Sequence, residues 1–343
     1  MADAALQKLK ADLKNQAIGS FYVFCGEEAY LREYYLDMLI QKLTAGTMDA
    51  FNFHRFDSQT LNFDSFGDAV EAMPMMAPRT LIRIDDVDFF KMDEQSRTRY
   101  GEILSDIPDY CCVVLDYDTV PYKPNGTMRK LADVFKKNAQ VIQFDKQSDR
   151  DLAVWVCRHF KAQDKTVSDE LCKYLVFITD GMMTTLHAEI EKICAFCSGS
   201  AVTRSDIDAV VVPALNAQTF DISNAICDGD YEKALVKMQT LFAMQEECIP
   251  ILGAISSQLR RLLYARMITA AGGGQQTLME LTSMQSYAAG LTMTAARRVS
   301  DRFCETAMQL CMDTDRKLKT SSENPERLLE LLVVQLAQEA RRA

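Results

Sequence analysis

The strongest constraint on this chain is a change in the spacing of its apolar residues near residue 145. Between residues 20 and 144, short runs rich in β-branched, aromatic and cysteine side chains alternate with stretches of helical periodicity. Such alternation is typical of a parallel sheet with helices on both faces, so we predict an α/β domain over residues 1–145. Its five strands are expected at residues 20–25, 51–57, 80–84, 110–115 and 140–144, and its helices at residues 1–15, 30–38, 64–73, 92–104 and 127–137.

After residue 148 only helical periodicity remains. We expect a small helical domain over residues 146–212 and a helical bundle over residues 213–343, with Pro213 at their boundary. Three consecutive glycines at residues 272–274 predict a flexible break in the bundle. The expected helices cover residues 152–160, 171–178 and 186–197, a segment that begins at a capping Thr203, and residues 220–228, 231–244, 249–271, 278–287, 294–312 and 325–340.

The composition is that of an ordinary globular protein and argues against some partners. Of 343 residues, 48% are hydrophobic and 25% are charged, and the formal net charge is −10. Because phosphate binding needs clustered lysine and arginine, this negative net charge disfavours a protein that binds nucleic acid over its main surface. No apolar run is long enough to span a bilayer, so we expect a cytosolic protein with no membrane contact.

The eleven cysteines are scattered along the chain, mostly in apolar stripes. This distribution is typical of buried thiols in a reducing compartment. Cys194 and Cys197 have the spacing of a zinc-binding pair, but no second pair follows at a suitable distance. We therefore expect them to pack in a helix, and we predict no metal site.

The turn after the first strand lacks the residues of a phosphate-binding loop. Such a loop needs a second glycine, a lysine and a hydroxyl at fixed spacing after its first glycine. After Gly26, the chain instead has Leu31, Arg32 and Glu33 at these positions. Glu27 and Glu28 would place carboxylates at the start of the next helix, where they satisfy its free N–H groups and repel phosphate. We predict a degenerate nucleotide loop with no bound cofactor.

Other polar residues offer no clear catalytic group. Asp85 and Asp86 follow the third strand, and Asp116 and Asp118 follow the fourth, where a phosphotransfer enzyme would hold magnesium. Without the lysine and glycine loop, we assign these aspartates to loop and cap roles. The three histidines, His54, His159 and His187, are expected to be packed or surface residues.

Residues 72–79, Ala-Met-Pro-Met-Met-Ala-Pro-Arg, separate a helical pattern from a strand pattern. Pro74 and Pro78 lack backbone donors and fix φ, so we expect a stiff turn. Met75 and Met76 at its apex are flexible and polarizable, which suits an adhesive surface. The alternative is that both methionines pack down onto their own domain.

The order of short motifs along the chain resembles the delta subunits of bacterial DNA polymerase III clamp loaders. The resemblance covers essentially the whole chain, and it is the order and spacing of the motifs that is specific. These motifs are Gly26-Glu27-Glu28 with Leu31, Asp180-Gly181, Glu189-Ile190-Glu191-Lys192, Asp221-Ile222, Gly229 with Ala234-Leu235, Gln258 with Arg260, and Asp315 with Leu318-Lys319.

The resemblance implies an AAA+ core and lid joined to a collar through which five subunits assemble. In this family, delta has no working ATP site, binds the ring-shaped sliding clamp (the beta subunit) and opens one of its interfaces. The implied partners are that clamp, the tau/gamma and delta prime subunits, and primed DNA within the complex. The chain would then be a non-catalytic part of a DNA-directed DNA polymerase, a nucleotidyltransferase holoenzyme, in the replisome at the bacterial nucleoid.

The family's clamp-binding stretch has the pattern Ala-Met-x-φ-φ-Ala-x-Arg, where φ is hydrophobic, and residues 72–79 match it. The resemblance therefore assigns clamp binding to Met73, Met75, Met76 and Arg79. Some members have Leu-Phe at the positions of Met75 and Met76, so these methionines would meet a pocket of a different shape.

Two other functions stay open. The first is a nucleotide hydrolase in which Arg32 replaces the lysine and Asp85 or Asp86 holds the metal. The second is a helical scaffold for DNA or for neighbouring subunits. Its candidate contacts are Arg260, Arg261 and Arg266, or Arg297, Arg298 and Arg302.

Overall fold

The computed structural model describes residues 2–44 and 51–342. Met1, where the first predicted helix was expected to begin, lies outside the described residues. The chain divides into two units, Met1–Gln147 and Ser148–Ala343, which are described separately. The first unit ends close to the boundary expected near Asp145. The further division of the second unit at Pro213 stays a prediction.

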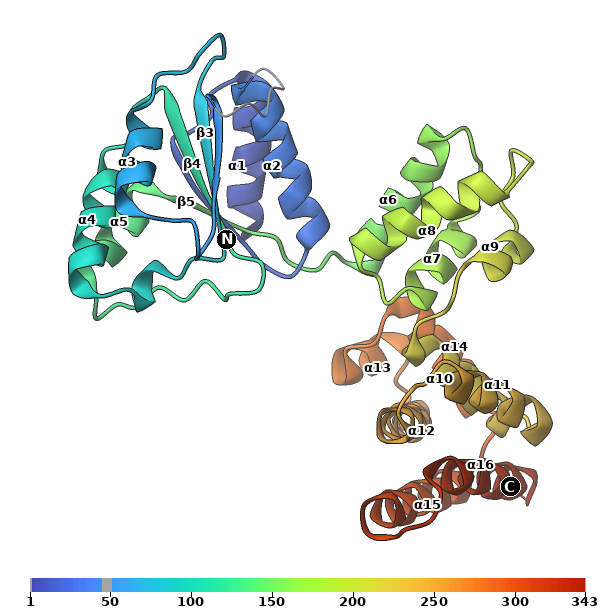
Figure 1. The fold of residues 1–343 in the computed structure, drawn as a ribbon. Helices are drawn as coiled ribbons and strands as arrows, with labels where there is room; N and C mark the ends of the chain where they lie inside the picture. The colour runs from blue at the N-terminus through green and yellow to red at the C-terminus, as the bar shows by residue number, and fades with distance from the viewer. Residues whose placement is uncertain (1, 45–50, 343) are drawn as a thin grey trace. The chain divides into compact units, whose positions relative to one another are not determined.

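The first unit is built on a five-stranded parallel sheet (Figure 1). Its strand order is β2-β3-β4-β1-β5, so the first strand lies between the fourth and the fifth. The expected class, α/β followed by all-α, is confirmed. The strands are β1 (Phe21–Cys25), β2 (Phe53–Phe56), β3 (Thr80–Asp85), β4 (Cys111–Asp116) and β5 (Gln140–Gln143).

Helices cover both faces of this sheet, because side chains on each buried strand alternate between two apolar cores. Tyr22 and Phe24 face one core, with α1 (Ala2–Asn15) and α2 (Ala29–Leu43). Phe21 and Val23 face the other core, which is covered by α3 (Phe63–Glu71), α4 (Glu94–Ser105) and α5 (Arg129–Asn138). Figure 1 shows these two groups of helices on opposite sides of the sheet.

Three predicted helix boundaries in this unit are wrong, and one of them is the start of the helix expected over residues 127–137, which begins at Arg129. The helix expected over residues 64–73 ends at Glu71, where Ala72 becomes extended. Phe66 and Val70 are buried as their spacing predicts, but Met73 is 78% exposed. The helix expected over residues 92–104 begins only at Glu94, because Asp93 caps it, and a short 3-10 turn, η1 (Phe89–Lys91), precedes it.

The second unit contains helices and one isolated bridge, between Thr166 and Ala201, in its described part. The long helix α12 packs against α10, α13, α14, α15 and α16 around one large apolar core. Thr203 forms the expected capping box with Asp206. The helices are α6 (Asp149–Ala162), α7 (Asp169–Ile178), α8 (Met183–Phe196), α9 (Arg204–Val210), α10 (Leu215–Cys227), α11 (Tyr231–Ala243), α12 (Cys248–Ala270), α13 (Gln275–Thr282), α14 (Ser286–Ala296), α15 (Asp301–Thr320) and α16 (Pro325–Arg342).

The predictions for residues 278–287 and 294–312, each as a single helix, are wrong. Ser283 has a left-handed backbone, with φ of 52°, and this ends α13 before α14 begins. Ser300 accepts a hydrogen bond from the Phe303 N–H and so starts α15 as a new helix. Apolar spacing continues across both breaks, which is why periodicity alone does not reveal them. The break at residues 272–274 lies between α12 and α13 as expected.

One expectation for the cysteines is also wrong. Cys157 and Cys172 form a disulfide between α6 and α7 rather than packing as two thiols. The other nine cysteines are free, including Cys194 and Cys197. Among the residues that the structure describes, no helix is both long and apolar enough to cross a membrane.

Candidate functional site

The carboxyl ends of the strands, where nucleotides bind in such sheets, are closed by the chain itself. Gly26 has φ of +115°, and a Cβ there would lie 2.3 Å from the Phe144 carbonyl oxygen. The same carbonyl accepts the Glu28 N–H at 3.0 Å. Glycine is therefore needed here for close packing against the end of β5, and one donor of a possible phosphate cradle is already used.

The two glutamates after Gly26 differ in their surroundings. Glu28 is buried at the start of α2, but its side chain makes no capping hydrogen bond, so the predicted capping role of this carboxylate is wrong. Glu27 is exposed.

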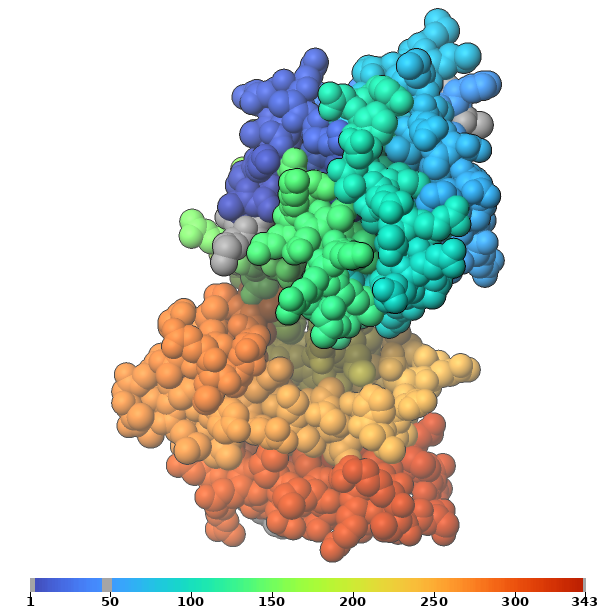
Figure 2. Space-filling model, turned by 90° about the vertical axis from the view of Figure 1, so that its left-hand side faces the viewer, coloured from blue at the N-terminus to red at the C-terminus, as the bar shows by residue number. Residues whose placement is uncertain are grey.

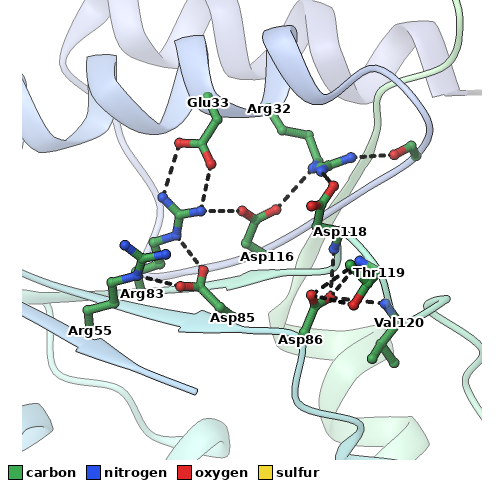
Figure 3. Close-up of polar contacts among 11 residues, drawn as sticks. Arg32, Glu33, Arg55, Arg83, Asp85, Asp86, Asp116, Asp118, Thr119 and Val120 are labelled. Carbon is green, nitrogen blue, oxygen red and sulfur yellow. Dashed lines mark hydrogen bonds and ion pairs between the residues drawn. The ribbon is translucent and has the colours of Figure 1, made fainter. Parts of the chain in front are cut away.

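Arg32 fills the position expected for a phosphate-binding lysine and turns inward (Figure 3). Its Nε donates to Asp116 Oδ1 at 3.1 Å, and both side chains are 3% exposed. The guanidinium also donates to the Gly26 carbonyl and to the Asp118 carboxylate. The cation at this position is thus held by groups of its own domain.

Arg83 on β3 also binds Asp116, so the contacts of Arg32 and Arg83 form one network of charged side chains, called the network below. Arg83 donates to Asp116 Oδ2 at 2.7 Å and to both carboxylate oxygens of Glu33, at 2.7 and 3.1 Å, and it pairs with Asp85. Burial opposes its charge, but the hydrogen bonds with Glu33 and Asp85 outweigh burial and raise the pKa of Arg83. Arg55 on β2 completes the network by donating to Asp85 Oδ2 at 2.5 Å.

All four aspartates at the carboxyl ends of β3 and β4 form hydrogen bonds or ion pairs with other groups of the protein; they are Asp85, Asp86, Asp116 and Asp118. Asp86 accepts the N–H groups of Asp118, Thr119 and Val120 at 2.8–3.0 Å and the hydroxyl of Thr119, which orders the loop after β4. Burial alone would raise the pKa of Asp86, but these hydrogen bonds lower it overall. Asp86 has the expected loop role, whereas the other three aspartates form ion pairs that the sequence did not predict.

No group of three or more potential metal ligands occurs among the described side chains. With Asp85 shared by two arginines and Asp86 bound to a loop, the carboxylates that a hydrolase would need are bound to groups of the protein. Nothing in this geometry favours the degenerate hydrolase.

The tip segment, residues 72–79, lies at the opposite edge of the sheet. It leads directly into β3 at Thr80, and β3 ends at Asp85 in the network, so the tip is at the amino ends of the strands. Figure 1 shows the connection from α3 to β3 at the top of the first unit, and Figure 2 shows the light-blue atoms of this part of the chain projecting there.

The two methionines at the apex are exposed. Met75 is 56% exposed and Met76 is 100% exposed, so the alternative in which both pack down onto their own domain is wrong. Met76 also has a left-handed backbone, with φ of 56°. This conformation costs a non-glycine residue of order 1–3 kcal/mol and persists only when its surroundings impose it.

Asn52 and Arg79 hold the tip from its two sides. The Asn52 side chain accepts the Met75 N–H at 2.7 Å and donates to the Met75 carbonyl at 2.8 Å. The Arg79 guanidinium donates to four oxygens of the domain at 2.5–3.1 Å, namely the carbonyls of Ile18, Gly19 and Cys111 and the hydroxyl of Ser20. Arg79 is thus an anchor at the base of the tip, in a different position from the exposed methionines.

Sequence reasoning missed Asn52 and Arg83. Each carried a signal in the sequence. Arg83 is a charged residue inside the apolar strand run of residues 81–84, and Asn52 lies in a predicted strand, where asparagine is disfavoured.

The basic candidates of the second unit fall into two classes. Arg266 donates to Asp301 and to the carbonyls of Val299 and Ala296, and Arg298 pairs with Asp228 at 2.5 Å, so both hold helices of this unit together. The side chains of Arg260, Arg297 and Arg302 are exposed, and Arg261 is partly buried beside Gln258.

Two family models match the chain. The model described as "DNA polymerase III, delta subunit" matches residues 22–145, which include the network and the tip. The model described as "DNA polymerase III delta subunit, C-terminal domain" matches residues 216–336. The chain belongs to the DNA polymerase III delta subunit family.

Individual relatives agree with this assignment. The DNA polymerase III subunit delta of Bacillus subtilis (strain 168) is 23% identical over 329 residues, which is 94% of each chain. A solved structure described as the Bacillus subtilis DNA clamp loader delta protein has a TM-score of 0.55 at 23% identity, and the match covers 96% of this chain and 99% of that one. The structural likeness shows that the fold is shared.

The buried network predicts different costs for two arginines of this delta-family chain. Arg32→Ala should lower the free energy of unfolding of the first unit by about 3 kcal/mol, because it leaves Asp116 buried with a lost partner. Arg55→Ala is the control: its side chain is 62% exposed, so its loss should cost less than about 1 kcal/mol.

The measurement is urea unfolding followed by hydrogen exchange and mass spectrometry, which reads peptides of the first unit separately from those of the second. Tryptophan fluorescence would follow the wrong unit, because the single tryptophan, Trp155, lies in the second one. Equal losses for the two variants would show that the buried network does not stabilise the fold.

The left-handed backbone at Met76 predicts a second effect on stability. Met76→Gly should be more stable than Met76→Ala by about 1 kcal/mol, since glycine adopts this conformation without the steric cost that alanine retains. Urea unfolding of the two variants measures the difference. A glycine variant no more stable than the alanine variant would show that the turn relaxes and holds no strain.

Proposed function

We propose that this chain is the delta subunit of a bacterial clamp loader, which binds the sliding clamp and opens it so that the loader can place it on primed DNA. The observation that carries the proposal is the fully exposed Met76 beside Met75 on a turn fixed at both ends. An exposed apolar pair held in a strained backbone indicates a contact surface, because neither feature helps the isolated domain to fold.

The chemistry of the tip suits a protein pocket. Burying two methionine side chains supplies on the order of 3–6 kcal/mol, which anchors a complex without making it tight unaided. Thioethers on unbranched chains adapt to pockets of varied shape. Met73, 78% exposed, adds apolar surface next to the pair, and Arg79 contributes by fixing the base of the tip.

The closed carboxyl edge supports a subunit that does not itself hydrolyse ATP. Arg32 occupies the position of the phosphate-binding lysine and is neutralised by Asp116 and Asp118. An incoming triphosphate would have to break these ion pairs to reach Arg32. Its negative charge would then lie beside the unpaired carboxylates of Asp116 and Asp118. Clamp binding by this subunit would then need no nucleotide of its own.

Assembly is assigned to the helical bundle over residues 213–343, as a collar that joins the tau/gamma and delta prime subunits. The exposed Arg260 and the partly buried Arg261 stay candidates for contacts with those subunits or with primed DNA. Within the holoenzyme, the chain would act in DNA replication as a non-catalytic part of the polymerase in the bacterial cytoplasm, at the nucleoid-associated replisome.

The tip predicts the behaviour of a double variant. Met75→Ala combined with Met76→Ala should weaken binding to the purified sliding clamp by at least about 100-fold, the equivalent of the lower end of the burial energy. Surface plasmon resonance with immobilised clamp measures this affinity, with and without ATP, and ATP should leave it unchanged.

Met312→Ala is the matched control, because this methionine is 62% exposed on α15, far along the chain from the tip. An unchanged affinity in a correctly folded double variant would remove the tip from the clamp-binding surface.

A further inference from the structure

Asn52 is the side chain that fixes the backbone of the tip at Met75. It lies directly before β2 and is 1% exposed. Its amide meets the Met75 backbone in two hydrogen bonds of opposite direction, at 2.7 and 2.8 Å. This pairing is the one that a neighbouring strand would make, but here it is made by a single side chain to a loop.

The Asn52 main chain is fixed in turn by the sheet. Its carbonyl accepts the Leu81 N–H of β3 at 2.8 Å, so Asn52 contacts the chain both within the tip and two residues after its end. The base of the tip is closed separately by the Arg79 guanidinium and by the Arg79 N–H, which donates to the Leu43 carbonyl at 2.9 Å. Met76 is thus the first residue beyond the Asn52 contact, and it has the left-handed backbone.

We infer that Asn52 is a positioning residue for partner binding: it presents Met75 and Met76 in a preformed turn and does not itself need to touch the partner. This inference rests on the proposed function of the tip. A side chain that can both donate and accept is required, because Met75 offers one N–H and one carbonyl. A preformed turn lowers the entropy lost when the partner binds, so the benefit appears as affinity.

The prolines of the tip cannot replace this contact. Pro74 and Pro78 restrict their own φ angles, but neither restricts the backbone of Met76, where the turn becomes left-handed. We therefore expect the orientation of the methionine pair to depend on Asn52 more than on the prolines.

The test is a double-mutant cycle on the full-length chain with purified sliding clamp. Asn52→Ala alone should weaken clamp binding about tenfold, as expected for the loss of two hydrogen bonds that hold the binding conformation. In the Met75→Ala/Met76→Ala background, the same change should alter affinity by less than about twofold, because there is no longer a pair to position. Asn125→Ala is the control: it also removes an asparagine that bonds to backbone, but in the loop between β4 and α5.

The outcomes separate the two claims. If the methionine double variant weakens binding but Asn52→Ala does not, the positioning role is wrong and the proposed function stands. If Asn52→Ala weakens binding equally in both backgrounds, Asn52 acts through something other than the methionines, and the inference is again wrong. If the folded methionine double variant binds normally, the tip assignment itself fails, and the positioning role with it.

A measurement on the unmodified protein guards against a variant that does not fold. Hydrogen exchange of the Met75 amide should be slowed relative to an unstructured peptide, because its N–H donates to a buried side chain. Free exchange at this amide in the folded wild-type chain would overturn the inference without any substitution.

Discussion

The buried pairing of Arg32 with Asp116 is the interaction around which the carboxyl ends of the strands in the first unit are arranged. A parallel sheet of this kind leaves its strand ends open to a nucleotide, and the phosphates would need cationic and N–H donors there. In this chain, the cation is inside the protein and its charge is balanced by Asp116 and Asp118. Separating these charges would cost several kcal/mol, so the closed state of this edge is the stable one.

The same sheet is organised at its other edge by a third arginine. Arg79 bonds to four oxygens at the amino ends of the strands, while Arg32 and Arg83 bond to carboxylates at the carboxyl ends. The sheet between them presents its apolar side chains to helices on both faces. Residues 72–79 are thereby held as an exposed loop on a rigid base, which is the arrangement expected of a binding element.

Sequence patterns predicted most of the architecture, because apolar spacing follows directly from burial. The five strands and the change to helices near residue 145 were readable in this way. The patterns failed where the backbone conformation or a capping hydrogen bond of one residue decides the structure: Ser283 and Ser300 break helices inside continuous apolar spacing, and Ala72 ends α3 before Met73. The Cys157–Cys172 disulfide and the Asn52 contact with Met75 join residues whose proximity only the folded chain reveals.

Oxidation of methionine side chains can show whether Met75 and Met76 enter a pocket of the sliding clamp, as proposed. The chain, free and saturated with clamp, would be treated with dilute peroxide and the sulfoxide at each methionine quantified by mass spectrometry. We predict that Met76, fully exposed in the free chain, becomes strongly protected in the complex, while Met312 on α15 oxidises at the same rate in both. Equal oxidation of Met76 in the free and bound states would show that this side chain stays exposed in the complex and does not enter a pocket.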